Sequence, residues 1–142
     1  MIEKVEKNKK IYAIIIRANY SKEGIEFFTP NEFSQQLAYM KRPKGYNISP
    51  HLHLNTNKNI QNTQEVLLIR SGKVRVDFYE SDKKYFLSKI LTKGDVILLA
   101  FGGHGFEILE ESEIIEVKQG PYEETKDKER FENTPKDKIN IS

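Results

Sequence analysis

Residues 65–79 read EVLLIRSGKVRVDFY, and this stretch carries the clearest structural signal in the chain. In its second half, Val74, Val76 and Phe78 alternate with charged residues, the period of two that is typical of a strand with one buried face. Its first half, residues 65–70, is a short apolar run that ends at Ser71-Gly72, a pair that favours a tight turn. We therefore expect two strands joined by a turn.

Comparable signals occur along most of the chain. Short apolar or alternating runs, separated by turns rich in Gly and Asp, predict further strands at residues 10–18, 24–29, 85–91, 96–100, 104–109 and 113–118. Residues 31–40 are ambiguous, because Asn31 could cap a short helical turn whereas residues 37–41 could equally enter a strand. The polar, Asn-rich residues 54–64 predict a long loop. Many short strands at such spacing indicate a sandwich or barrel.

The domain organisation follows from length and composition. A chain of 142 residues suits one domain with a single core. We expect a barrel with N-terminal strands over residues 1–122. Residues 123–142 are expected to form a charged C-terminal tail, surface-draped or partly disordered, with Phe131 and Ile139 as its anchors.

Charge and cysteine content exclude several classes of function. The net charge is +2, from 23 basic and 21 acidic residues, so we expect no nucleic-acid partner. The alternating charges of residues 3–10 are expected to form a solvated face. No apolar run reaches the roughly 18 residues that cross a bilayer, and no signal-peptide pattern is evident. Because the chain has no Cys, any metal site must use imidazole, carboxylate and water. We expect a cytoplasmic protein without a membrane partner.

The three histidines suggest a metal site. On a strand, His51 and His53 would point to the same face. Glu65 heads an apolar strand, where a carboxylate needs a partner, and His104 lies in the Gly-rich run FGGHGF. Three imidazoles and one carboxylate suit one divalent transition metal ion such as Zn, Fe, Mn or Ni. The alternatives are exposed strand histidines, imidazoles that act as acid–base groups without an ion, a surface carboxylate paired with a lysine, and a structural histidine at position 104.

The spacing of these residues resembles the two sequence motifs of the cupin superfamily. Gly45, His51, His53, Glu65 and Gly72 match the pattern G-x5-H-x-H, then E-x6-G. Gly94 with Gly103-His104 is similar to the second motif, although Phe101 stands in place of its proline and its final Asn is absent. The interval between His53 and Glu65 is also longer than usual. The resemblance covers about residues 42–122.

This resemblance implies an all-β, single-domain cupin, a double-stranded β-helix or jelly-roll barrel, with metal ligands at His51, His53, Glu65 and His104. The segments around residues 63–79 and 94–122 resemble short single-domain cupins of surface-polysaccharide gene clusters, and more loosely the WxcM-like nucleotide-sugar ketoisomerases. That likeness implies a small-molecule ligand, a sugar or nucleotide sugar.

We expect a metal-dependent sugar isomerase or epimerase whose general base the sequence does not identify. A non-catalytic small-molecule binding cupin and an Fe(II)-dependent dioxygenase remain open. A homodimer through the apolar run of residues 11–16 is also expected.

Overall fold

The computed structural model describes residues 1–120 and 128–142, and this part of the chain is built from β-strands without an α-helix. The strands are β1 (Ile2–Lys7), β2 (Lys10–Ile16), β3 (Gly24–Phe27), β4 (Ala38–Lys41), β5 (Glu65–Tyr79), β6 (Tyr85–Thr92), β7 (Val96–Leu99) and β8 (Gly103–Lys118), followed by one short 3-10 helix, η1 (Lys136–Lys138). The main sheet has the order β1-β2-β7-β5-β6, with β8 also paired to β5, while β3 and β4 form a separate pair. The expected boundary between residues 122 and 123 lies outside the described residues.

The prediction of a tight turn at Ser71-Gly72 is wrong, because β5 runs through it as one strand. The register with β8 shifts repeatedly between Ile69 and Val74, which marks β-bulges. Gly72 has a φ of +87°, which an L side chain rarely adopts. Bulges bend and twist a strand. The first half of β5 therefore pairs with β7 and its second half with β6.

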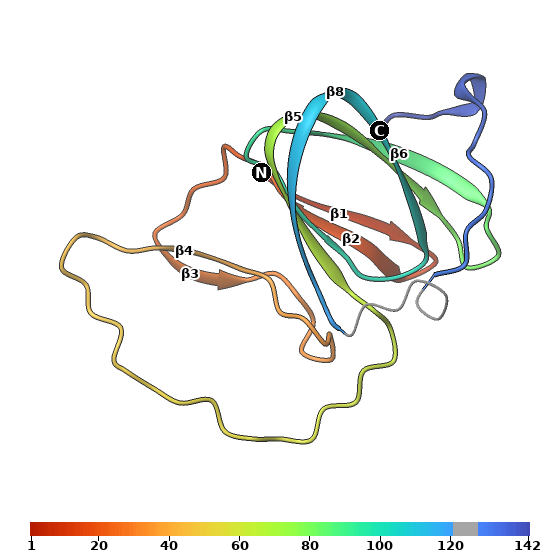
Figure 1. Cartoon of the computed structure of the whole chain (residues 1–142). Coiled ribbons are helices and arrows are strands. Elements are labelled where there is room, and N and C mark those ends of the chain that lie inside the picture. Colours follow the sequence, from red (N-terminus) through yellow and green to blue (C-terminus); the bar gives the residue numbers. More distant parts are fainter. Residues whose placement is uncertain (121–127) are drawn as a thin grey trace.

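Strand β8 is also continuous, so the two strands expected at residues 104–109 and 113–118 are one. It pairs antiparallel with β5 from end to end. At the bulge, the Ser112 hydroxyl accepts a hydrogen bond from the backbone N–H of Lys73 at 3.0 Å. These bent, paired strands curl the sheet strongly into a half-barrel (Figure 1).

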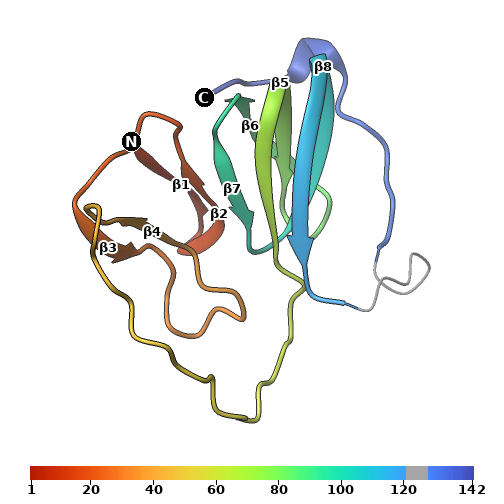
Figure 2. The same cartoon turned by 60° about the vertical axis from the view of Figure 1, so that its left-hand side comes forward.

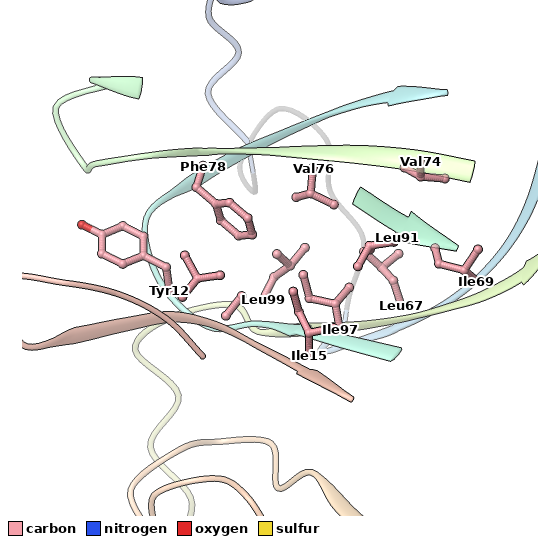
Figure 3. Packing of buried hydrophobic residues seen from close by; sticks show 12 residues of the cluster. Tyr12, Ile15, Leu67, Ile69, Val74, Val76, Phe78, Leu91, Ile97 and Leu99 are labelled. Atoms are coloured by element: carbon pink, nitrogen blue, oxygen red, sulfur yellow. The ribbon is translucent and has the colours of Figure 1, made fainter. Parts of the chain in front are cut away.

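The main core lies inside this curl. Val74, Val76 and Phe78 of β5 point from one half of the sheet toward Ile97 and Leu99 of β7 on the other half (Figure 3). All five side chains are at most 3% exposed. The alternation read from residues 73–79 is thus confirmed as a buried inner face.

Strand β2 is buried on both faces, which explains its continuous apolar run. Ala13 and Ile15 face the inner core, whereas Ile14 and Ile16 pack with Leu37 in a second cluster on the other side of the sheet. The expected dimer surface at residues 11–16 therefore lies inside the subunit; the homodimer itself stays a prediction.

The N-terminal residues form a strand that the sequence reasoning missed. Their alternating charges were expected to make a solvated face, but β1 pairs with β2 and its Val5 is 2% exposed. Lys4 and Glu6 are exposed, so one face of β1 is solvated as expected while the other face is buried. No helix in residues 1–120 or 128–142 is long and apolar enough to cross a membrane.

Two irregular segments lie outside the sheet. The predicted loop at residues 54–64 is observed within a longer arc, residues 42–64, that swings away from the sheet (Figure 2). The arc is exposed except for Gln64, whose side-chain oxygen accepts the Gln35 N–H at 3.0 Å. The described part of the tail runs over the sheet, where the Phe131 ring packs edge-on against Tyr79 with centroids 4.9 Å apart.

Candidate functional site

The curl of the sheet brings two of the predicted site residues together. Glu65 begins β5, whereas His104 is paired with Phe78 near the other end of that strand. Thirteen positions separate Glu65 from Phe78, which in a flat strand would span about 43 Å. In the curled sheet, Nε2 of His104 lies 2.7 Å from Oε1 of Glu65.

Each partner is placed by its neighbours in the sheet. Glu65 sits between Leu99 of β7 and Lys118 of β8, so its backbone is held on both sides. His104 follows a turn at Gly102, whose φ is +75°; a Cβ there would collide with the Tyr12 ring. Glycine at position 102 thus permits the turn that delivers His104 beside Glu65.

The Glu65 carboxyl is kept ionised by its surroundings. Its side chain is only 12% exposed. Burial alone raises the pKa of Glu65, but hydrogen bonds from His104 and then from Glu116 outweigh it and hold that pKa at about 2. The hydrogen bond with Glu65 raises the pKa of the Glu116 carboxyl in turn. A proton between the two carboxyl groups therefore resides on Glu116.

The pair lies on the wall of a pocket of about 750 Å³. Strands β5 and β8 supply Glu65, His104 and Phe106, and Phe131 of the tail closes another side. Residues 61–63, at the end of the long arc, also line it. Charged, aromatic and amide side chains thus converge on one hollow large enough for a small organic molecule.

The other two predicted ligands lie elsewhere. His51 and His53 were expected on a strand, but they sit in the exposed arc, which has no strand pairing. Their rings meet edge-on with centroids 5.3 Å apart, and Nδ1 of His51 is 2.9 Å from the carbonyl oxygen of Ser49. The four residues thus form two separate pairs. Nowhere in residues 1–120 and 128–142 do three or more His, Cys, Asp or Glu side chains gather as a metal site. In this conformation the predicted set does not fit a metal ion.

Sequence reasoning missed Glu116 and the contribution of the tail to the pocket. Glu116 is the Cα partner of the buried Leu67, so it interrupts the inner face of β8 with a carboxyl group. The sequence of residues 113–118, EIIEVK, does not reveal that Glu116 faces inward. The bulge earlier in β8 determines which residues of this run point to the inner face of the sheet. Phe131, expected as an anchor of the tail, does pack onto the sheet.

The site is described from this chain alone. Comparison with family models, with curated proteins and with solved structures found no match to this chain.

Proposed function

We propose that the protein is a cupin-type enzyme that moves a proton on a carbohydrate-related small molecule, as an isomerase or epimerase. The observation that carries the proposal is the contact between Glu65 and His104 on the wall of the pocket. The strongly curled, all-β sheet supports the cupin assignment at the level of architecture.

The chemistry follows from the two side chains. Glu65 is a carboxylate at neutral pH, so it accepts the Nε2–H of His104 and fixes the tautomer of the ring. Nδ1 of His104 is then the nitrogen that can take a proton from a carbon beside a substrate carbonyl, which leaves an enediolate. Isomerisation returns that proton to the former carbonyl carbon, while the hydroxyl proton passes to the former carbonyl oxygen. Inversion instead requires a second donor, such as water, to deliver a proton to the opposite face of the original carbon.

The lining of the pocket favours an enzyme over a non-catalytic binding module. A cavity lined only by apolar groups would suit binding without turnover. Here an acid–base pair lies in the wall beside the aromatic rings of Phe106 and Phe131. Proton transfer needs a titratable group within reach of the substrate carbon, and His104 supplies one.

Metal binding is a separate proposal. We infer that a divalent transition metal ion binds His51, His53, Glu65 and His104 only after the arc carrying the first two folds over the pocket. Residues 61–63 of the same arc already line that pocket. Protein purified without chelators should carry about one ion per chain, and His51→Ala with His53→Ala should remove it. Unchanged metal content in the double variant would contradict this site.

Deuterium exchange tests the proton-transfer proposal. The protein is incubated without oxygen in D₂O with a panel of nucleotide sugars and free sugar phosphates, and loss of C–H signals is followed by proton NMR. We expect exchange with at least one of them and a fall of at least about 100-fold in His104→Phe. Exchange that persists in that variant would contradict the role of His104.

Glu113→Gln is the matched control for Glu65→Gln, because Glu113 is an exposed carboxylate on β8 paired with Arg70. Only Glu65→Gln should slow the exchange. Binding without exchange would favour a sensor, and turnover that requires oxygen would favour the Fe(II) dioxygenase.

A further inference from the structure

Strand β8 has an open edge with apolar side chains beside it. It pairs with β5 along its length, and in the described part of the chain no strand pairs with its other side. Phe106 and Ile108 are 42% and 53% exposed, and Ile115 and Val117 are 45% and 59% exposed. A long edge strand flanked by exposed apolar groups is a ready template for another strand.

The exposed arc contains a segment with the pattern of a strand. Residues 46–54 read YNISPHLHL, in which Tyr46, Ile48, Leu52 and Leu54 recur at even positions. Leu52 and Leu54 are 91% and 85% exposed. A period of two with leucines left in water indicates a strand whose partner is missing.

Charge favours residues 46–54 over a second copy of β8 as the partner of this edge. The glutamates of β8 are Glu107, Glu110, Glu111, Glu113 and Glu116. Two of them pair with Arg75 and Arg70, which leaves the strand acidic. Residues 46–54 contain no acidic residue, and Lys44 and Lys58 flank them in the sequence. A second copy of β8 would instead place glutamates beside glutamates, which disfavours pairing of this edge with itself.

The chain connection permits the pairing. The arc leads directly into Glu65, the first residue of β5, whose Cα partner is Lys118 at the end of β8. Residues 55–64 can span about 33 Å when extended, enough to lay the segment along the strand.

We propose that residues 46–54 add as a strand to the open edge of β8 and extend the sheet. The apolar even positions then share one face of the sheet, and His51 and His53 share the other. This inference does not depend on the proposed enzyme function or on a metal ion.

The proline in the segment fixes which backbone groups face β8. In a strand, the N–H and C=O groups of residues with the same parity point to the same side. Pro50 has no N–H, and a proline is tolerated where its nitrogen faces away from the ladder. The odd residues, 47, 49, 51 and 53, therefore donate to β8, while the even residues face solvent.

Amide exchange by NMR on the metal-free protein tests the pairing. The amides of residues 47, 49, 51 and 53 should exchange at least tenfold more slowly than those of residues 48, 52 and 54. Equal and rapid exchange at all seven would overturn the proposal.

Paired variants separate docking from a change of charge alone. Leu52→Asp with Leu54→Asp places acid against the acidic edge and should abolish the protection. Asn55→Asp with Asn57→Asp adds the same charge just outside the segment and should keep it. All four side chains are exposed, so the sheet should stay folded. Protection that grows with protein concentration, with a doubled mass, would show exchange of the segment between two copies and contradict docking within one chain.

Discussion

At the scale of single residues, Glu65 couples the stability of the fold to pH. Its folded pKa of about 2 lies below the ordinary value of 4.5. A carboxyl group with a depressed pKa stabilises the fold fully above its unfolded pKa, and this contribution is lost as the pH falls from about 4.5 toward 2. The raised pKa of Glu116 acts in the opposite direction and reduces the net effect.

We therefore expect Glu65→Gln to lower the free energy of unfolding by about 1–2 kcal/mol at pH 7. The difference from the wild type should shrink as the pH falls from 4.5 toward 2. Urea unfolding across this pH range measures it, with Glu113→Gln as the exposed control. A constant difference at every pH would mean that Glu65 contributes through packing rather than through its charge.

At the scale of elements, the bulge at Gly72 determines how β5 and β8 bend together. A Cβ at position 72 would collide with the backbone oxygen of Glu111 and the hydroxyl of Ser112, and the positive φ would strain any side chain. The collision and the strain both destabilise the pairing of β5 with β8, the strands that carry Glu65 and His104.

Gly72→Ala should cost at least about 2 kcal/mol of unfolding free energy. Gly45→Ala is the matched control, because Gly45 has nearly the same φ, +88°, with no atom within 4 Å of the added Cβ. Its cost should be about 1 kcal/mol, from backbone strain alone. Equal thermal and urea stability of the two variants would show that the close approach at Gly72 has no energetic consequence.

The same elements show where sequence reasoning succeeds and where it stops. Apolar periodicity located most strands, since alternation such as that of residues 73–79 depends only on local burial. The turn predicted at Ser71-Gly72 is wrong, because a bulge and a turn both use glycine at positive φ. Only the paired strand distinguishes them, and that pairing is not local in sequence.

At the scale of the whole molecule, the central feature is the curl of the sheet, which brings distant parts of β5 and β8 together at the pocket. Glu65 and His104 are both candidate ligands from the sequence, yet their contact depends on the bulges between Ile69 and Val74, where the paired strands β5 and β8 bend. His51 and His53 were expected on a strand beside them, and the Asn-rich arc places them in solvent instead. Spacing in sequence selected four candidate residues, but their assembly depends on strand pairing that is not local in sequence.

The most direct test of this curled arrangement is an NMR titration of the Glu65 carboxyl carbon in the folded, metal-free protein. We predict a pKa of about 2 for Glu65 in the wild type. In His104→Phe, Glu65 loses the hydrogen bond from the imidazole, which lowers its pKa. Burial, which raises the pKa of Glu65, is then less opposed, so this pKa should rise clearly. His51→Phe, which alters a histidine of the exposed arc, should leave it unchanged. A wild-type value near 4.5, or a value unaffected by His104→Phe, would contradict the claim that the curled sheet joins these two residues in one site.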